Sequence, residues 1–300
     1  MAAGGPVAAQ SDLIVMTSLP NMAFPFFVHM QKELDAEAEA LGGITLMKSD
    51  GQGSTPKQTA DVEAAIVQGV DGIIISPNEV DAMAPALEQA VEAGIPVVTI
   101  DRRVDGVDGI FAHVGADNVK GGEAQGELIV ALFPDGAKVF NLQGQPGASP
   151  AIDRNAGVHN VLDQQADKYP FVFEQTANFA RDKGLSVTEA GLAGMDQPPD
   201  VIVAANDDMA LGAIEAVKAA GHSIPVIGFD ALPEAIASVQ GGELAASIEQ
   251  FPGEQSRTAL RLLVEYLRDG TKPENDLILL TPVAITSENL DTAERLGEVN

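Results

Sequence analysis

Phenylalanine is concentrated beside planar polar side chains at a few points of this sequence. The chain has eleven Phe, two Tyr and no Trp, yet three rings fall within the stretch "NMAFPFF". Two further Phe and several Asp, Asn and Arg side chains stand in "TIDRR", "NFARDKG", "ANDDMALG" and "VIGFDALPE". An aromatic face stacks on the C–H face of a sugar, while carboxylates, amides and guanidinium groups pair with its hydroxyls. These residue types therefore indicate carbohydrate binding.

The sequence offers little for catalysis. Its four histidines, at positions 29, 113, 159 and 222, lie in separate segments without metal-ligand spacing, and cysteine is absent. It contains no phosphate-binding G-x-x-x-x-G-K-[ST] loop, no dinucleotide-binding G-x-G-x-x-G turn and no serine nucleophile elbow. We therefore expect a protein that is not an enzyme and that uses no metal and no cofactor.

The elements that must position these side chains follow a repeating pattern. Short β-branched runs alternate with segments of helical periodicity, which is typical of parallel sheets covered on both faces. The first series has candidate strands "DLIVMTSL", "ITLMKS", "GIIIS", "PVVTI" and "IFAHVGA". Its predicted helices start near Phe26 and end at Gly42, then cover about 56–68, 81–93 and 118–132.

A second series of the same kind follows. Its candidate strands are "AKVFNLQG", "FVFEQTA", "VIVAA", "PVIGF" and "LAASIEQ", with helices around 150–166, 181–193, 207–220 and 233–240. The amphipathic segment "PGEQSRTALRLLVEYLRDG" has no strand series of its own, so we expect it to cross back to the first unit. The residues from "LTPVAIT" onward predict a short strand and a terminal helix.

The predicted fold is α/β, with two doubly wound parallel-sheet lobes, since 300 residues exceed one compact core. Open sheets of this kind bind ligands at the carboxyl ends of their strands. The Phe-rich and polar stretches follow predicted strands directly, so we expect them to meet at one edge of each sheet.

The order of "PFF", "TIDRR", "AIDR", "NFARDKGL", "ANDDMALGA", "VIGFDALPE" and "LAASIEQFP" resembles the ribose-binding family of periplasmic proteins that serve ABC importers. The resemblance extends from about residue 12 to 286. It implies two lobes joined by three chain crossings that form a hinge. It also implies a first lobe of 11–116 plus 251–281 and a second of 117–250 plus 282–300. From their small, apolar side chains we expect residues 1–10 to be a flexible leader.

The resemblance also implies a set of ligand-binding positions. Those that match the family pattern are Phe26, Phe27, Asp101, Arg102, Arg154, Phe179, Asn206, Phe229, Asp230 and Gln250. Phe24 departs from it, because the family carries an asparagine there that bonds a sugar hydroxyl. We include Phe24 in the candidate site, and expect a deoxy sugar, a differently configured sugar or a polyol in place of ribose, since an unsatisfied hydroxyl costs about 1 to 3 kcal/mol.

Several of these residues also have purely structural interpretations. Phe26 and Phe27 begin an apolar helical face, so either could belong to the core. Asp207 and Asp208 open a predicted helix and are expected to be a cap and a dipole partner outside the site. Asn206 could itself be the cap, but Asp207 can fill that role, so we favour ligand contact for Asn206. Arg103 is expected to bridge the lobes or face solvent.

Charge narrows the ligand and the partners. In the candidate site Asp101 and Asp230 offset Arg102 and Arg154, which favours a neutral sugar or polyol. The whole chain has a formal charge of -27, which disfavours nucleic acid. The family resemblance implies a periplasmic monomer, exported by a signal peptide that these residues lack, with ABC permease subunits and a chemoreceptor as candidate partners.

Two other functions fit a doubly wound fold. A sugar-responsive regulator would share this effector-binding architecture, but its DNA-binding module has no counterpart before the strand that begins near residue 12. A dehydrogenase is disfavoured by the missing phosphate-binding turn. Fluorescence of added NADH would distinguish the dehydrogenase.

Overall fold

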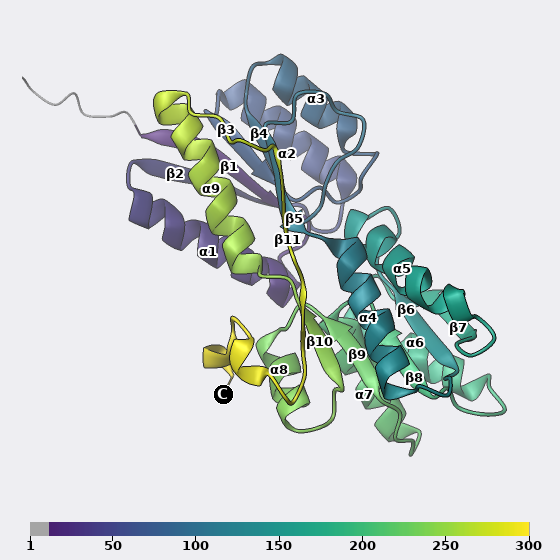
Figure 1. Cartoon of the computed structure of the whole chain (residues 1–300). Helices are drawn as coiled ribbons and strands as arrows, with labels where there is room; N and C mark the ends of the chain where they lie inside the picture. Colours follow the sequence, from purple (N-terminus) through teal and green to yellow (C-terminus); the bar gives the residue numbers. More distant parts are fainter. Residues whose placement is uncertain (1–11, 300) are drawn as a thin grey trace, which may run out of the picture.

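The computed structural model describes residues 12–299 and builds them into two lobes stacked end to end (Figure 1). The predicted leader, 1–10, lies outside the described residues. Each lobe is organised around one sheet with helices on both faces. The two-lobed doubly wound fold predicted from the alternation of strands and helices is thus confirmed.

The first sheet has the strand order β11-β5-β4-β3-β1-β2, and all its pairings are parallel. Its strands are β1 (Leu13–Leu19), β2 (Ile44–Asp50), β3 (Gly72–Ile75), β4 (Val97–Ile100), β5 (Ala112–Ala116) and β11 (Leu277–Leu280). Strand β11 reaches this sheet from far along the sequence, and it was not predicted.

The second sheet has the order β12-β10-β9-β8-β6-β7. Its strands are β6 (Val139–Gln143), β7 (Phe171–Thr176), β8 (Val201–Ala204), β9 (Val226–Phe229), β10 (Ala246–Glu249) and β12 (Val283–Ile285). Only β12 pairs in the antiparallel sense among the strands described within 12–299. The two sheets therefore repeat one winding order, with the last strand added at the edge.

The helices lie between successive parallel strands, because a parallel connection must cross over the sheet. In the first lobe they are α1 (Pro25–Leu41), α2 (Thr55–Gln68), α3 (Ala84–Glu92) and α9 (Pro252–Asp269). In the second they are α4 (Asn118–Leu132), α5 (Ser149–Leu162), α6 (Arg181–Ala193), α7 (Asp207–Ala219) and α8 (Pro233–Gln240). As expected, α9 returns to the first lobe and packs against α1 and β5.

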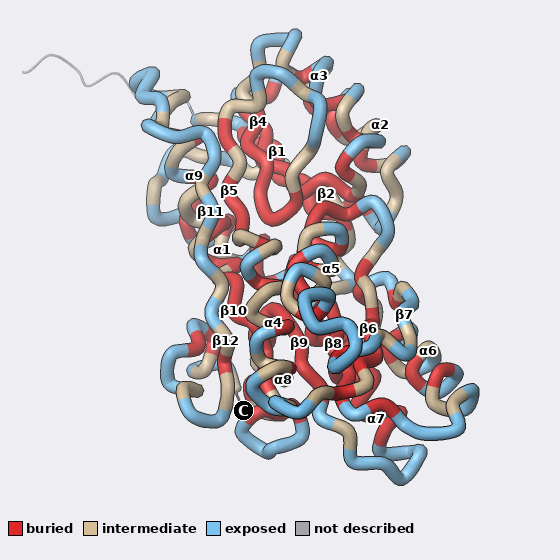
Figure 2. The backbone as a smooth tube through the Cα atoms, turned by 45° about the vertical axis from the view of Figure 1, so that its right-hand side comes forward, coloured by how far each residue is buried: buried red, intermediate tan, exposed pale blue. Residues whose placement is uncertain are grey.

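Successive side chains of a strand point to opposite faces of the sheet, so alternate residues pack into separate cores on the two faces. In β3, Ile73 and Ile75 point toward α2 and α3, whereas Ile74 points toward α1 and α9. In β8, Val201 and Val203 belong to the core under α4 and α5, and Ile202 to the core under α6 and α7. Figure 2 shows the central strands buried along their whole length. Such double burial explains why these strands read as continuous apolar runs.

The end of the chain differs from the prediction. Residues 283–285 form the expected short strand, but no α-helix follows it among the residues described up to 299. Two short 3-10 helices, η2 (Leu290–Thr292) and η3 (Leu296–Glu298), stand there instead. Leu290, Ala293 and Leu296 pack under α8, so a few apolar anchors rather than a continuous helical face hold this segment.

The chain passes from one sheet to the other three times within the described residues. These passages follow β5, β10 and β11, and they lead to α4, α9 and β12 respectively. The three connections lie close together between the lobes in Figure 1. They form the hinge that the resemblance implied, while the exact lobe boundaries stay a prediction.

Candidate functional site

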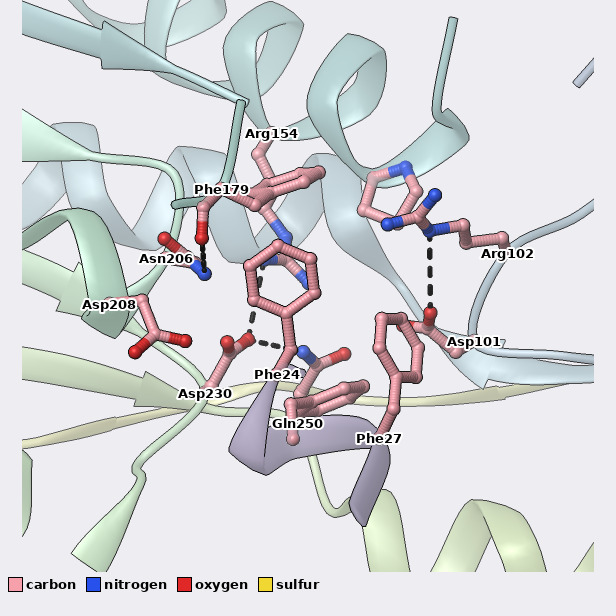
Figure 3. Close-up of a pocket in the computed structure, with 12 residues that line it drawn as sticks. Phe24, Phe27, Asp101, Arg102, Arg154, Phe179, Asn206, Asp208, Asp230 and Gln250 are labelled. Atoms are coloured by element: carbon pink, nitrogen blue, oxygen red, sulfur yellow. Dashed lines mark hydrogen bonds and ion pairs between the residues drawn. The ribbon is translucent and has the colours of Figure 1, made fainter. Parts of the chain in front are cut away.

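The carboxyl ends of the strands in both sheets face one another across the gap between the lobes. All the predicted site residues except Phe229 line a single pocket there (Figure 3). The pocket is lined by Phe24, Phe26, Phe27, Asp101, Arg102, Pro150, Arg154, Phe179, Asn206, Asp208, Asp230 and Gln250. Pro150 and Asp208 are additions that the sequence interpretation did not include.

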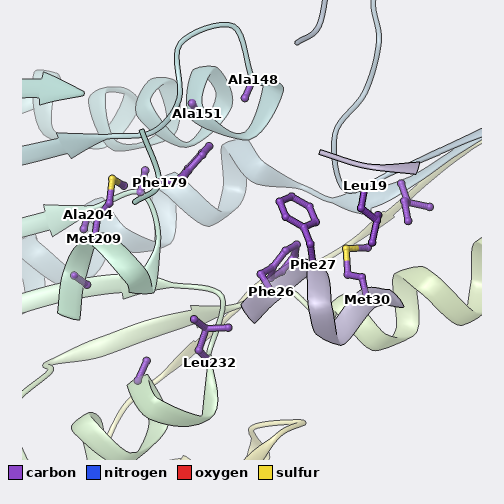
Figure 4. Close-up of a cluster of buried hydrophobic side chains, with 14 of the residues drawn as sticks. Leu19, Phe26, Phe27, Met30, Ala148, Ala151, Phe179, Ala204, Met209 and Leu232 are labelled. Carbon is purple, nitrogen blue, oxygen red and sulfur yellow. The ribbon is translucent and has the colours of Figure 1, made fainter. Parts of the chain in front are cut away.

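Three rings from the start of α1 form the wall contributed by the first lobe. Phe24 is the N-cap residue and Pro25 occupies the first turn, which directs Phe26 and Phe27 inward. The Phe26 and Phe27 rings meet edge to face with centroids 5.3 Å apart, and Phe24 approaches Phe27 at 6.4 Å. Phe26 and Phe27 are also members of the buried core in Figure 4. Both interpretations of these rings, core and pocket, hold together.

Phe179 supplies a ring from the second lobe. Its backbone is left-handed, with φ of 60°, a conformation that costs a bulky residue energy and that surrounding structure must enforce. Gly144 makes room for it, because a Cβ there would lie 2.2 Å from the Phe179 ring. The Arg102 and Arg154 guanidinium groups lie 5.7 and 5.9 Å from the centre of this ring.

Asp101 and Arg102 follow β4 directly and form the polar part of the first wall. The Asp101 carboxylate accepts a hydrogen bond from Ser76 at 3.1 Å, and its Oδ2 lies 3.8 Å from Arg102 Nε. Arg102 donates to the backbone oxygen of Asn78 at 2.9 Å and to Gln145 of the second lobe at 3.4 Å. Asp101 also has a left-handed backbone, with φ of 59°.

Arg154, Asp230 and Gln250 form a connected polar network on the second wall. Asp230 Oδ1 accepts hydrogen bonds from Gln250 at 2.5 Å and from Arg154 at 3.4 Å. Arg154 also donates to Asn118 at 2.9 Å and to the backbone oxygen of Ala205 at 2.7 Å. Its guanidinium is thus held in one orientation from the interior side.

Phe229 lies behind this network instead of lining the pocket. It is the last residue of β9 and is fully buried. The centre of its ring lies 3.6 Å from the Arg154 guanidinium carbon, a close cation–π stack. In this arrangement Phe229 supports Arg154, and any direct ligand contact of its ring stays a prediction.

The expected role of Asp207 as the helix cap is wrong, whereas Asn206 has both positions that the sequence allowed it. Asn206, not Asp207, caps α7, because its Oδ1 accepts the backbone N–H of Met209 at 3.0 Å. Its amide nitrogen donates to the backbone oxygen of Phe179, so Asn206 both caps the helix and lines the pocket. Asp207 instead ties two neighbouring segments, accepting from Leu232 N–H at 2.8 Å and Ser247 Oγ at 2.7 Å. Asp207 is thus the first residue of α7 and is fully buried.

Asp208 was placed outside the site, and the structure puts it in the pocket wall beside Asp230. Its helix already has a cap in Asn206, so the dipole interpretation alone does not explain its buried position. With Asp208 the pocket has three carboxyl groups against two guanidinium groups. These groups leave no surplus positive charge for an anionic ligand, in keeping with the neutral ligand predicted from sequence.

Burial controls the ionisation of these groups. It raises the pKa of Asp101, raises that of Asp208 to about 6 and raises that of Asp230 to about 7. Arg154, next to Asp230, opposes the rise there, and Arg102 opposes it at Asp101. Burial also lowers the pKa of Arg102 to about 10. Arg102 therefore stays charged at neutral pH.

Three buried polar atoms of the pocket have no hydrogen-bond partner within residues 12–299. They are the donor Arg102 Nε and the acceptors Asp208 Oδ2 and Gln250 Oε1. Unpaired buried polar atoms are rare and costly. A ligand that both donates and accepts hydrogen bonds would satisfy all three, which is the property of a hydroxyl group.

The lobes are closed over this pocket. Val80 N–H donates to the backbone oxygen of Gly147 at 2.8 Å, and Arg103 N–H donates to Ser149 Oγ at 3.0 Å. The Arg103 side chain pairs with Asp153 of α5. Arg103 thus bridges the lobes, as one of its two predicted roles had it.

Within the part of the chain that the structure describes, no helix is long and apolar enough to cross a membrane. The same residues hold no cluster of three or more His, Asp or Glu side chains arranged for a metal ion.

Comparison with known proteins gives a consistent result. The model of the periplasmic binding protein domain family matches residues 15–272. The ribose import binding protein of Bacillus subtilis is 41% identical over 245 residues, which cover 81% of this chain and 78% of that protein.

Solved structures agree with this assignment. The myo-inositol binding protein of Caulobacter, bound to myo-inositol, superposes with a TM-score of 0.93 at 44% identity and covers 98% of this chain and 100% of that one. A galactofuranose binding protein superposes with a TM-score of 0.90 at 31% identity, covering 96% and 99%. The chain therefore belongs to the periplasmic binding protein family, and within it to the ribose-binding-like proteins that bind sugars.

Proposed function

We propose that this protein captures a neutral sugar or polyol in the pocket between its lobes and delivers it to the permease of an ABC importer. The observation that carries this proposal is the set of unpaired buried atoms in an aromatic pocket: Arg102 Nε, Asp208 Oδ2 and Gln250 Oε1. Hydroxyl groups would satisfy donor and acceptors alike, while the rings would cover the C–H faces of the same ligand.

A cyclitol such as myo-inositol is the first ligand to test, and D-ribose is the second. The relative bound to myo-inositol is similar over nearly the whole chain, at 44% identity. Phe24 counts against D-ribose, since its ring cannot make the hydrogen bond to a sugar hydroxyl that the family's asparagine makes there. A cyclitol carries a hydroxyl on each ring carbon, which suits a pocket rich in acceptors.

The chemistry proposed is binding and release only. Asp101, Arg102, Arg154 and Asp230 act as fixed hydrogen-bonding groups, and the ligand leaves unchanged. We place the protein outside the cytoplasmic membrane, where an importer collects its substrate, and we expect it to act as a monomer. Opening at the hinge would release the ligand at the permease.

A thermal-shift screen followed by titration calorimetry tests this function. The panel is myo-inositol, D-ribose, D-allose, D-galactose and xylitol, with glutamate and phosphate as charged controls. We expect at least one neutral member to raise the melting temperature and to bind with one site per chain, since a ligand of the folded state stabilises it by mass action. A response to the charged controls alone would contradict the proposal.

A further inference from the structure

Two adjacent aspartates at the start of α7 have very different surroundings. Both oxygens of Asp207 accept hydrogen bonds, from Leu232 and Ser247. Asp208 is only 8% exposed, and no hydrogen bond or ion pair to it occurs among residues 12–299. Asp207 is explained by the fold, whereas Asp208 is not.

The position of Asp208 relates it to the ligand pocket. Figure 3 shows its carboxylate beside that of Asp230, at the edge of the group of side chains that line the pocket. Asp208 and Phe24 also line a second, outer hollow together with Pro25, Arg181 and Leu185. Asp208 therefore lies at the boundary between the enclosed pocket and its mouth.

Among residues 12–299, no cation contacts this carboxylate directly. Within that range Arg181 is the cation whose charge opposes the rise in the pKa of Asp208, and its side chain bonds other carboxylates. It bonds Glu215 at 3.1 Å and Glu234 at 2.7 Å. Burial, opposed by Arg181 and assisted by Glu234, raises the pKa of Asp208 to about 6, so the carboxylate is mainly ionised at neutral pH.

We propose that Asp208 is a specificity-determining residue that accepts a hydrogen bond from the ligand hydroxyl nearest the mouth of the pocket. An ionised carboxylate only accepts hydrogen bonds, so it requires a free hydroxyl at that position. A deoxy or O-methyl derivative would leave the buried charge without a partner. This inference rests on the proposed sugar or polyol function, and it names the residue that hydrogen-bonds one of the ligand hydroxyls.

The buried Asp208 carboxylate favours ligand binding but lowers the stability of the ligand-free protein. An unpartnered buried carboxylate destabilises the ligand-free fold, and the ligand relieves that cost when it binds. A residue kept for structure alone would stabilise the protein when intact. The two roles therefore differ in the sign of the change in melting temperature on removing the charge.

Titration calorimetry and thermal unfolding of the full chain test the inference with Asp208→Asn and Asp208→Ala. The matched control is Asp182→Asn, which removes one charge near the outer hollow from a side chain that is 77% exposed. With myo-inositol we expect both Asp208 variants to bind about 10- to 100-fold more weakly than the wild type, because a bond to a charged group is lost. The control should bind as the wild type does, and ligand-free Asp208→Asn should melt at the same or a higher temperature.

The second arm compares myo-inositol with its singly deoxygenated derivatives, or D-ribose with its deoxy derivatives if ribose binds more tightly. One missing hydroxyl should weaken binding to the wild type about 10-fold or more while leaving binding to Asp208→Ala unchanged. Equal binding by the wild type and the Asp208 variants would overturn the inference but leave the proposed function intact. A wild type that binds no member of the neutral panel would overturn the proposed function itself, and this inference with it.

Discussion

The two walls of the pocket hold the same pair of residue types in different ways. On the first lobe, Asp101 and Arg102 are adjacent in sequence and 3.8 Å apart, and the rest of that wall is aromatic. On the second lobe, Arg154 and Asp230 come from distant segments and are joined to Asn118 and Gln250 by hydrogen bonds. The second wall is therefore a rigid polar network, while the first is chiefly an apolar surface that closes over it.

This difference assigns separate tasks to the lobes. A preorganised network loses little freedom when it binds hydroxyls, so we expect the second lobe to determine which stereochemistry is accepted. The rings of the first lobe contribute apolar contact to any pyranose, furanose or cyclitol face. Changes on the second wall should therefore alter stereochemical selectivity most, although loss of the carboxylate on either wall should abolish tight binding.

The largest effect is expected from Asp230→Ala. This change removes the acceptor shared by Arg154 and Gln250 and leaves a buried guanidinium without its ion pair, at a cost of about 3 to 5 kcal/mol. We predict that tight binding is abolished in titration calorimetry.

Asp101→Ala should act in the same direction and abolish tight binding as well. The control for both variants is Asp196→Ala, at an exposed position far from the pocket. Unchanged affinity in both site variants would remove the assignment of the pocket.

The pH dependence of stability should be substantial. Burial raises the pKa of Asp230 to about 7, and that of Glu249 at the hinge to about 7, well above their unfolded values of about 4. The folded state then binds more protons than the unfolded state between about pH 4 and 7, so stability is highest at the acidic end and is lost as pH rises through 7.

Ligand-free protein should therefore melt at a higher temperature at pH 5 than at pH 8. Arg154, Gln250, Asp101 and Asp208 surround Asp230, and Arg154 limits the effect. The Asp230→Asn variant should show a weaker dependence. A melting temperature that rises from pH 5 to pH 8 would contradict the assigned ionisation.

Phe24→Asn should produce a moderate change in specificity. The amide would offer the first wall a hydrogen bond that the Phe24 ring lacks, worth about 0.5 to 1.5 kcal/mol. We predict a shift of about 3- to 10-fold in relative affinity toward D-ribose and away from myo-inositol. Phe24→Leu serves as the control, since it removes the ring without adding a polar group. A parallel loss for both ligands in both variants would mean that Phe24 contributes only apolar contact.

The smallest effect is expected from Arg103→Ala. Arg103 ties the lobes through Asp153, but the pair is partly exposed, with 34% and 19% of the two side chains accessible. Such pairs contribute about 0.2 to 1 kcal/mol. Ligand affinity should fall by up to about 5-fold in calorimetry, mainly through faster release. An affinity loss as large as that of Asp230→Ala would indicate a direct role in binding.

Local sequence patterns predicted most of the elements. The helices at 118–132 and 181–193 were predicted with the bounds that the structure has, because each lies between two short apolar strands and is followed by a helix breaker, Pro134 or Gly194. Strand β11 was missed, since Leu277 and Leu279 are exposed and pair with β5 only through contacts far along the chain. The prediction of a terminal helix was wrong, because tertiary packing under α8, and not a continuous apolar helical face, holds that segment.

Most of the residues that line the site could be predicted from the sequence, but their backbone conformations and relative positions could not. The strand-end positions and the family resemblance together indicated the residues that line the pocket, for all but Phe229, while their contacts with a ligand stay a prediction. The left-handed backbones at Asp101, Phe179 and Asp230 are enforced by surrounding structure, and no local sequence signal reveals them. Asp207 and Asp208 are chemically identical and adjacent, so only the fold could distinguish the structural carboxylate from the one facing the pocket.

The most direct test of the account is a crystal structure of the protein grown with the panel member that stabilises it most. We predict the ligand between the lobes, with its ring faces against Phe27 and Phe179 and its hydroxyls on Arg102, Asp208 and Gln250. A ligand bound outside this pocket, with these side chains free of it, would contradict the account.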